Sequence, residues 1–362
     1  MSRKFITTPR RTLRCAAPVA LACLALGAGA AEAKVPRGFY GAEANPVGSL
    51  SQTDSRRMRS AHLGTLRVTF NWGQVEPTPG ALRDWSYYDT IVERAARARV
   101  SIMAVLSGSP SWAAGGSAYA PQTLAARTAY YAFVRDVVRR YGHGGSYWRS
   151  HRGVPRRPLA SYQVWNEPNY PPHWGDGPSR ARDYASLLRQ TARTIRAVDR
   201  KAVIATAGLL ASSTRGPAGF SYLDDLYAIK GIRKYFDAVS VHPYAEDTRG
   251  VEGELTRIRQ VMRRRGDGRT PIWISELGWA TGGENQYFST TPAGQARRLT
   301  SAFRFVVRNR ARFGVSRLIW FSWSDRVGPA GRGWEFYCGL FTTNGQPKPA
   351  WAAFRRFTLA TR

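Results

Sequence analysis

Short apolar runs that alternate with helix-forming segments constrain the fold of this chain most strongly. Eight such runs end in a turn or a polar residue, which is typical of buried parallel strands. They span residues 38–43, 65–72, 100–107, 161–167, 202–207, 236–242, 271–276 and 317–323. Eight strands, each followed by a helix or helical turn, predict an α/β fold, a single (β/α)8 TIM barrel with its active site at the C-terminal ends of the strands. An open doubly wound sheet competes with this interpretation, but the glycine-rich phosphate turn that such sheets normally carry after an early strand is missing.

Amphipathic stripes fill several intervals between these strands. Apolar residues recur at helical spacing from Tyr130 to Tyr141, where Gly142 follows as a stop signal, and again from Tyr184 to Val198. Thr291-Pro292 is a capping and first-turn pair for a third helix. Residues 142–158 are rich in Gly, Pro and Arg, and we expect a long surface loop there. Because no linker or internal repeat interrupts the pattern, we expect one catalytic domain.

The N-terminus has the pattern of a secretory signal. Its first 14 residues are basic and carry no acid, an Ala/Leu-rich stretch follows to Ala31, and Ala31-Glu32-Ala33 is a cleavage site. We therefore expect a secretory signal peptide over residues 1–33, a catalytic domain over 34–362, and a secreted, extracellular protein. The apolar run is shorter than the roughly 20 residues of a membrane span, which disfavours an uncleaved anchor. Arg10-Arg11 matches a twin-arginine export signal only loosely.

The charge of the chain bears on its partners. It carries 54 Lys and Arg against 24 Asp and Glu, a formal net charge of +30. Such a charge attracts anionic polymers, but the basic residues are scattered and no nucleic-acid-binding motif accompanies them. We expect no nucleic-acid partner, and an anionic cell-wall polymer is a candidate partner. Cys338 is the one cysteine beyond the signal segment, which excludes a disulfide scaffold. The five histidines lack metal-ligand spacing, so neither a metal nor a cofactor is expected.

Two glutamates close predicted strands. Glu167 ends the fourth strand in Tyr-Gln-Val-Trp-Asn-Glu-Pro-Asn, and Glu276 ends the seventh in Ile-Trp-Ile-Ser-Glu-Leu-Gly-Trp. Carboxylates beside apolar strands are costly unless they are paired or used. On a barrel both would face one cleft, and such a pair suits the hydrolysis of a glycosidic bond. Glu43, Glu76 and Asp325 hold similar positions, and for these we expect structural or peripheral roles.

These segments resemble the acid/base and nucleophile strands of clan A glycoside hydrolases. This clan comprises retaining (β/α)8 glycosidases and includes cellulase-like and β-xylosidase-like families. The resemblance covers the whole mature chain and rests on WNEPN at 165–169, ISELGW at 274–279, Val-His-Pro-Tyr after the sixth strand and the closing segment 339–351. The cellulase-like family commonly has a histidine at the end of the third strand. This chain reads Val-Leu-Ser-Gly-Ser-Pro-Ser-Trp at 105–112, which weakens an assignment to that family.

The resemblance implies a double displacement. Glu276 would be the nucleophile and Glu167 the general acid/base, with carboxyl groups about 5–5.5 Å apart. We expect partial burial and the charge of Glu276 to raise the pKa of Glu167, so that it can donate a proton near neutral pH. Asn166 would bind the 2-hydroxyl of the sugar.

The resemblance also implies partners for the nucleophile and aromatic platforms for the sugar. Arg67, His242 and Tyr244 would hydrogen-bond Glu276 and keep it ionised. A tryptophan of the eighth strand floors the sugar site in this clan, and we prefer Trp323 to Trp320 because it lies nearer the C-terminal end of the strand. Aromatic faces bind sugar rings, and the two further platforms expected from the sequence are Trp174 and Trp279.

The sequence therefore predicts a monomeric, secreted, retaining O-glycosyl hydrolase that cleaves β bonds of a poly- or oligosaccharide. Two other functions remain open. One is a non-catalytic glycan-binding barrel, which the presence of both glutamates disfavours. The other is a glycan-remodelling transglycosylase, which uses the same residues and differs in the acceptor that the cleft admits.

Overall fold

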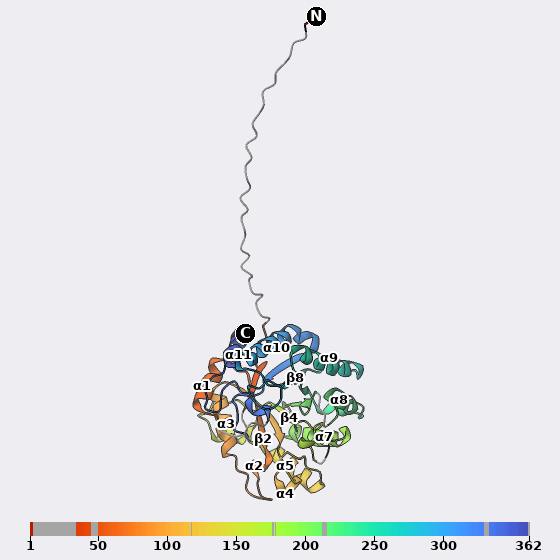
Figure 1. The fold of residues 1–362 in the computed structure, drawn as a ribbon. Coiled ribbons are helices and arrows are strands. Elements are labelled where there is room, and N and C mark those ends of the chain that lie inside the picture. Colours follow the sequence, from red (N-terminus) through yellow and green to blue (C-terminus); the bar gives the residue numbers. More distant parts are fainter. Residues whose placement is uncertain are drawn as a thin grey trace. The chain divides into compact units, whose positions relative to one another are not determined.

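The computed structural model describes residues 1–2, 34–44, 50–116, 118–175, 177, 179–211, 216–328 and 333–360. All but the first two residues of the predicted signal peptide lie outside this part of the chain. From residue 34 onward strands and helices alternate, and Figure 1 shows the helices arranged around the sheet. The predicted α/β fold is confirmed.

Within the described residues, nine strands form one parallel sheet. They are β1 (Tyr40–Glu43), β2 (Thr65–Asn71), β3 (Ser101–Ser107), β4 (Ser161–Val164), β5 (Val203–Ala205), β6 (Leu209–Leu210), β7 (Val239–His242), β8 (Ile272–Leu277) and β9 (Val315–Trp320). Their order is β5-β4-β3-β2-β1-β9-β8-β7-β6. All eight predicted strands are present, and β6 is the one that the sequence did not predict separately. Isolated bridges join Ala205 to Ala238 and Asn166 to Gly208 beside the interruption between β5 and β6.

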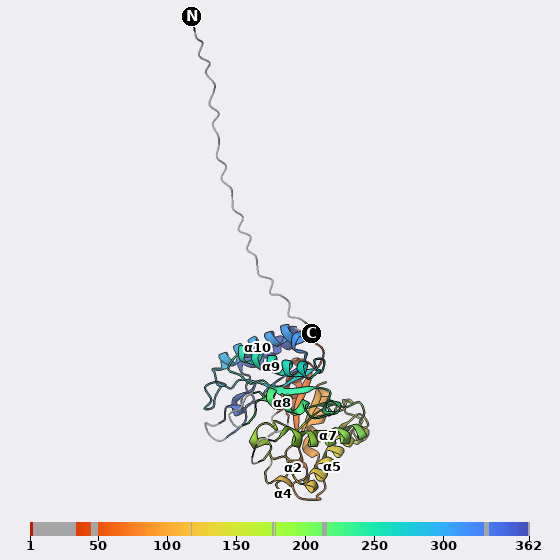
Figure 2. The same ribbon diagram turned by 90° about the vertical axis from the view of Figure 1, so that its right-hand side faces the viewer.

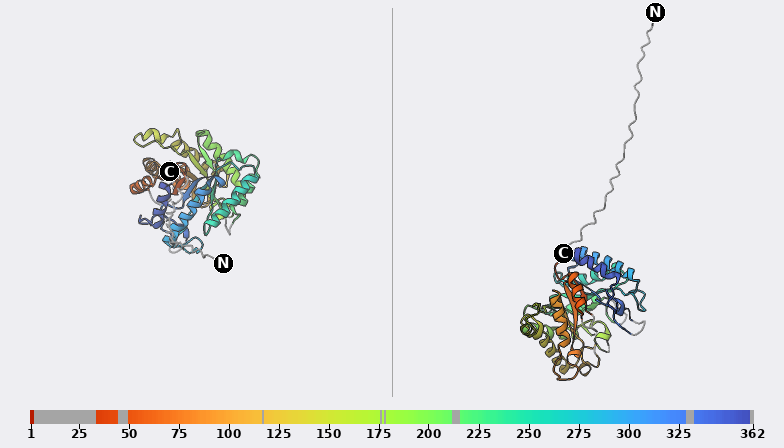
Figure 3. Two further views of the ribbon diagram at one scale, coloured as in Figure 1. Left: turned by 90° about the horizontal axis from the view of Figure 1, so that it is seen from above. Right: turned by 90° about the vertical axis from the view of Figure 1, so that its left-hand side faces the viewer.

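The helices follow the strands in sequence and cover the sheet. They are α1 (Gln52–Ser60), α2 (Trp72–Val75), α3 (Ser86–Arg97), α4 (Ser111–Ala114), α5 (Leu124–Tyr141), α6 (Ser146–Ser150), α7 (Ala181–Val198), α8 (Gly219–Tyr227), α9 (Thr248–Arg264), α10 (Pro292–Phe313) and α11 (Pro349–Ala360). Three short 3-10 helices are η1 (Pro171–His173), η2 (Ile232–Tyr235) and η3 (Trp334–Tyr337). Figure 2 shows α9 and α10 side by side, as their contacts require, and Figure 3 gives further views of the arrangement.

Capping residues fix the ends of the predicted helices. The Thr291 hydroxyl accepts a hydrogen bond from the Gly294 N–H, so the predicted start of α10 is confirmed. Gly142 ends α5, also as predicted. The stretch 142–158 is not wholly a surface loop, because α6 buries Tyr147 and Trp148 against the core. The Trp148 indole N–H donates to the Tyr141 carbonyl at 2.9 Å, which anchors the segment.

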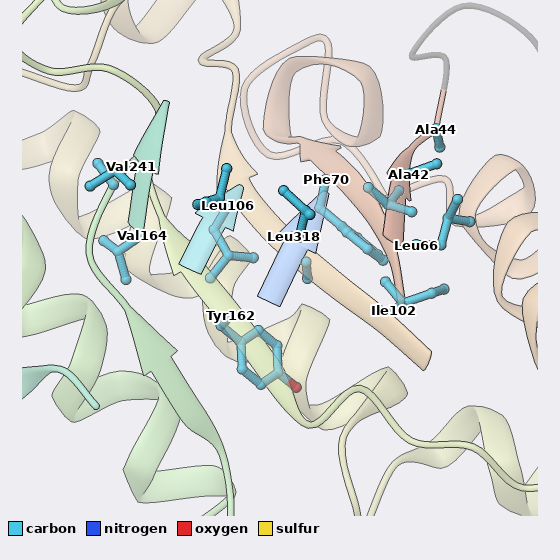
Figure 4. Packing of buried hydrophobic residues seen from close by; sticks show 14 of the residues in the cluster. Ala42, Ala44, Leu66, Phe70, Ile102, Leu106, Tyr162, Val164, Val241 and Leu318 are labelled. Atoms are coloured by element: carbon cyan, nitrogen blue, oxygen red, sulfur yellow. The ribbon is translucent and has the colours of Figure 1, made fainter. Parts of the chain in front are cut away.

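The core lies between the strands and the surrounding helices. The strands are buried on both faces, as expected when helices cover a parallel sheet, and Figure 4 shows part of this packing around Leu66, Leu106 and Leu318. Successive side chains of a strand point to opposite faces of the sheet. A separate small cluster of buried apolar residues consists of Met103, Ala205, Ala238 and Trp273. Among the helices that the structure describes, none combines the length and the apolarity needed to cross a membrane.

Candidate active site

Glu167 and Glu276 meet at the C-terminal ends of the strands. Glu167 follows β4 and Glu276 lies in β8, and both side chains are buried apart from a small exposed edge. One carboxylate oxygen of each and one imidazole nitrogen of His242 all lie within 4.8 Å of one another. The structure therefore brings together the two glutamates that the sequence predicted to share a cleft.

Left-handed backbone conformations orient the side chain of Glu167. Trp165 and Glu167 adopt left-handed φ angles of 68° and 42°, which cost about 1–3 kcal/mol each for residues other than glycine. Two backbone hydrogen bonds hold the segment, from Trp165 N–H to the Leu106 carbonyl and from Glu167 N–H to the Gly208 carbonyl. Because β4 ends at Val164, this turn positions the Glu167 side chain, and the hydrogen bonds of the strand do not.

Glu276 is held by a cation and a phenol. Its Oε1 lies 2.7 Å from Arg67 Nη1, and its Oε2 accepts a hydrogen bond of 2.8 Å from the Tyr244 hydroxyl. Burial raises the pKa of Tyr244 well above its usual value, so the phenol keeps its proton and remains a donor. Arg67 and Tyr244 are two of the partners that the resemblance implies for Glu276.

Arg67 connects Glu276 to a third carboxyl group. Its guanidinium also contacts Glu43 at the end of β1, and its Nη2 donates to Asn166 Oδ1 at 2.7 Å. Burial, opposed by Arg67 and assisted by the charge of Glu276, raises the pKa of Glu43 to about 7. A structural or peripheral role was expected for Glu43, and the structure places it in the buried ion-pair network beside Glu276 and not at the periphery. This side chain shares the buried guanidinium with Glu276, because β1 and β2 are adjacent strands in register.

Glu167 lies between two imidazoles. Its Oε1 is 2.6 Å from Nδ1 of His242, and its Oε2 is 2.8 Å from Nδ1 of His173. Burial raises the pKa of Glu167, but the two histidines outweigh burial, and the pKa is lowered in the absence of a sugar. The expected rise of this pKa is thus not found in the free protein. The sequence reasoning considered the charge of Glu276 and omitted the imidazoles.

Asn166, next to Glu167 in the sequence, is held through its side-chain oxygen. Its Oδ1 accepts from Arg67 and from the Gln163 side chain, at 2.7 and 3.2 Å. Gln163 is in turn fixed by the Ser240 hydroxyl, which donates to Gln163 Oε1 at 3.2 Å. Since the oxygen is occupied, the Nδ2 hydrogens remain to donate to a sugar hydroxyl, as predicted for the 2-hydroxyl contact.

His242 joins the two halves of the site. It is completely buried, and its Nε2 lies 3.4 Å from Glu276 Oε1, while Nδ1 faces Glu167. Gly208 makes room for it, because a Cβ on that residue would overlap Nε2. His242 was expected beside Glu276, but its shorter contact is to Glu167.

The same residues form a potential cation site. Glu167, His242 and Glu276 are the group among the described residues whose ligand atoms lie close enough for a metal ion. However, the Arg67 guanidinium contacts Glu276 and already supplies a positive charge there. No step of the chemistry below depends on a metal.

Trp323 is buried among aromatic side chains. Its indole N–H donates to Asp54 Oδ1 at 3.0 Å, and its ring packs against Phe341 and Trp351. The alternative, Trp320, is also buried and donates its indole N–H to the Cys338 carbonyl. The predicted floor of the sugar site is therefore wrong, because the end of β9 turns both indoles into the packing between strands and helices.

The two other predicted platforms are also core residues. Trp279 is fully buried, its indole N–H donates to the Ala245 carbonyl at 2.9 Å, and its ring packs on Trp320. Trp174 packs between Trp165 and Tyr184 of α7. Neither ring presents a free face to a sugar. Position after a catalytic strand predicted proximity to the site, but it could not predict on which side of the loop the indole packs.

A different aromatic group adjoins the nucleophile. The ring of Trp334, in η3, lies 5.0 Å from that of Tyr244, and the ring of Phe321 lies 6.2 Å from it. Trp334 is partly exposed, whereas Phe321 is buried except for 8% of its surface. These residues belong to the segment after β9, and the clustering of tryptophans near strand ends was the available signal for Trp334.

The remaining strand-end acids have structural roles, as expected. Asp325 pairs with the buried ammonium of Lys348 at 2.9 Å, and Glu76 pairs with Arg83 at 2.8 Å. Cys338 is buried, and burial raises the pKa of its thiol, which keeps it unreactive.

Comparison with known families gives one match to the chain. The family model described as the glycosyl hydrolase catalytic core matches residues 158–354, more than half of the sequence. The chain belongs to this family of glycosyl hydrolases. The matched segment of the glycosyl hydrolase includes both glutamates. A search of curated proteins found no match to the sequence.

Several solved glycosidases share the fold. A family 39 glycoside hydrolase from Bacteroides cellulosilyticus WH2 has a TM-score of 0.66 at 17% identity, covering 89% of this chain and 63% of that one. A monomeric β-xylosidase from Caulobacter crescentus CB15 has a TM-score of 0.65 at 18% identity, covering 90% and 69%. A glucosidase from Croceicoccus marinus has a TM-score of 0.65 at 15% identity, covering 89% and 67%.

The glycosyl hydrolase spans less than two thirds of the first of these relatives, and at such identities the likeness shows the fold alone. The family match confirms the predicted glycoside hydrolase, and these solved glycosidases share its fold.

Proposed function

We propose that this glycosyl hydrolase is a retaining enzyme that cleaves β-glycosidic bonds by double displacement. One observation carries the proposal. Oxygens of Glu167 and Glu276 approach within 4.8 Å. Retaining glycosidases hold their carboxyl groups about 5–5.5 Å apart, whereas inverting enzymes need roughly 6.5–9.5 Å to admit a water molecule. A pair this close leaves no room for that water.

The surroundings of the two carboxylates distinguish their roles. Glu276 is paired with Arg67, a permanent cation, and with the Tyr244 hydroxyl, and this arrangement suits the nucleophile. Glu167 faces the imidazoles of His173 and His242, and imidazole is the side chain whose ordinary pKa lies nearest to neutral pH. A carboxyl group beside titratable partners suits the general acid/base.

The reaction then follows from this division. Glu276 attacks the anomeric carbon while protonated Glu167 gives its proton to the leaving oxygen, forming a covalent glycosyl-enzyme. Glu167 next takes a proton from water, which attacks the same carbon and releases the sugar. The amide of Asn166 donates to the 2-hydroxyl, and such contacts strengthen in the transition state.

The test is a substrate panel with matched variants. The solved structures of similar fold include a β-xylosidase, a glucosidase and a β-galactosidase, so we expect turnover of 4-nitrophenyl β-xyloside, β-glucoside or β-galactoside. Glu276→Gln should lose at least a thousand-fold in kcat, since removal of a unit of the catalytic machinery costs this much or more. Arg83→Gln, which breaks the distant Glu76 pair, is the control. Normal turnover by Glu276→Gln would refute the assignment, and an inverted product by NMR would refute retention.

The interrupted strand supports closure of the sheet. We infer that β5 and β6 are two segments of one strand, so that nine segments make the eight strands of a closed (β/α)8 barrel. Three pairings support this. β5 pairs with β4, β6 pairs with β7, and Ala205 at the end of β5 bridges to Ala238 just before β7.

Export of the enzyme remains part of the proposal. The sequence of residues 1–33 favours a cleaved signal, and the high positive charge suits contact with an anionic cell wall. N-terminal sequencing of protein from the culture medium should begin at Lys34. Recovery of the intact chain from the membrane fraction would contradict it.

A further inference from the structure

His173 contacts the acid/base from a loop that carries no recognised motif. It is the last residue of η1, after Glu167, and its Nδ1 lies 2.8 Å from Glu167 Oε2. Because His242 faces Oε1, each oxygen of the Glu167 carboxylate faces an imidazole nitrogen. A general acid must carry its proton on one of these oxygens.

The position of His173 is fixed by backbone contacts. Its carbonyl accepts the indole N–H of Trp165 at 2.7 Å, and its own N–H donates to the Tyr170 carbonyl at 3.0 Å. The Tyr170 ring meets the imidazole edge to face, with centroids 5.3 Å apart. These contacts hold the His173 imidazole against the Glu167 carboxylate.

The contact has the character of an ion pair. Nδ1 of His173 is buried and makes no hydrogen bond of good geometry, although its distance to Oε2 is short. A buried nitrogen in this state is costly unless charge attraction or a function compensates. The rest of the side chain is 35% exposed, so the imidazole can exchange protons with water.

We propose that His173 stores the proton that Glu167 delivers. This inference rests on the proposed function. In the free enzyme the proton resides on Nδ1 of His173, beside the Glu167 carboxylate. It passes to Oε2 as a leaving group docks: the N–H bond breaks, an O–H bond forms, the imidazolium becomes neutral and so does the carboxylate. In the second half-reaction Glu167 takes a proton from water and returns it to His173.

The charges around His173 favour this arrangement. Burial lowers the pKa of His173, but the close contact with the Glu167 carboxylate and its charge outweigh burial, and Glu276 adds to the rise while Arg67 opposes it. His242 faces the other oxygen of the same carboxylate, and Tyr170 is the remaining titratable neighbour. Glu167 and His173 therefore share one proton. The alkaline limb of the pH profile of kcat/KM measures the loss of this proton from the pair.

The first test needs no substrate. In 15N-histidine-labelled protein, NMR titration of His173, assigned with His173→Gln, should give a pKa above the ordinary value of about 6.5. Glu167→Gln should lower this pKa by at least one unit, since the charge that raises it is gone. An identical His173 pKa in both proteins would overturn the proposal, and this outcome is independent of whether the enzyme turns over any sugar.

The second test is kinetic. For the methyl glycoside of the best sugar in the panel, His173→Gln should move the alkaline limb of kcat/KM at least one pH unit toward acid, because Glu167 alone loses its proton earlier. The 2,4-dinitrophenyl glycoside, whose leaving group needs no acid, should show little change. An unmoved limb with the methyl glycoside would also overturn the proposal.

A matched histidine provides the control. His143 pairs with Asp199 through Nδ1 at 2.7 Å and is 34% exposed, but lies outside the site. His143→Gln should leave the alkaline limb of kcat/KM unchanged for both glycosides. An equal shift in this variant would assign the effect to general destabilisation and refute a special role for His173. Full activity of Glu167→Gln would instead show that the proposed function itself fails.

Discussion

Glu43→Gln is expected to change how the stability of the enzyme depends on pH. Glu43 is buried at the end of β1, where burial raises its pKa from 4.5 to about 7. Its folded state thus binds the proton more tightly than its unfolded state. The stabilisation is complete below about pH 4.5 and is lost as the pH rises through about 7.

The magnitude follows from the size of this shift. One pKa unit corresponds to about 1.4 kcal/mol, so the shift corresponds to roughly 3 kcal/mol in the free energy of unfolding. Glutamine mimics the protonated acid at every pH. The variant should match the wild type near pH 4.5 and exceed its stability by up to about 3 kcal/mol near pH 8. Arg67 remains paired with Glu276 in the variant, so no buried cation is left alone.

Urea denaturation at pH 4.5, 6 and 8, followed by tryptophan fluorescence, measures this difference. Glu93→Gln is the control, because Glu93 forms an exposed pair with Arg97 that contributes at most about 1 kcal/mol at any pH. A constant difference between Glu43→Gln and wild type across the range would refute the reasoning. A variant that loses stability as the pH rises would show that ionised Glu43 is needed by Arg67.

Three further substitutions test other parts of the structure. Tyr244→Phe removes the hydroxyl donor to Glu276 and should lower kcat by roughly 10- to 100-fold with an unchanged circular dichroism spectrum, while unchanged kcat would contradict the contact. Trp323→Phe loses the hydrogen bond to Asp54 and should cost about 1 kcal/mol in thermal denaturation without affecting turnover, and a loss of turnover would return Trp323 to the sugar site. Lys348→Met leaves Asp325 buried without its cation and should cost about 3–5 kcal/mol in urea denaturation; a cost below 1 kcal/mol would show the pair to be hydrated.

Much of the fold could be predicted because strand and helix periodicities are local signals. The apolar runs at 65–72 and 100–107 end within one residue of β2 and β3. The interruption between β5 and β6 was not predicted, because residues 202–207 read as one apolar run. The close approach of His242 to Gly208 beside this interruption is a tertiary contact, which a local pattern does not reveal.

The candidate site could be predicted only in part. Glu167 and Glu276 were identified because carboxylates at the ends of apolar strands are costly unless they are paired or used. Arg67 was identified through the family resemblance, and the structure places it against Glu276. The three tryptophan platforms failed because an indole near a strand end can pack on either side of its loop. His173 was missed because a short loop without a motif gives no sign of which histidine turns back toward the glutamate.

Gly208 leaves the space that allows His242 to contact both Glu167 and Glu276. Gly208 contributes no atom to the chemistry, yet the imidazole that lies between Glu167 and Glu276 occupies the volume where any other amino acid would place its first carbon. A one-carbon addition there would uncouple the two acids while leaving both of them, and every charge around them, in the sequence. Among homologues, position 208 should therefore tell an intact catalytic pair from a disconnected one when both glutamates are retained.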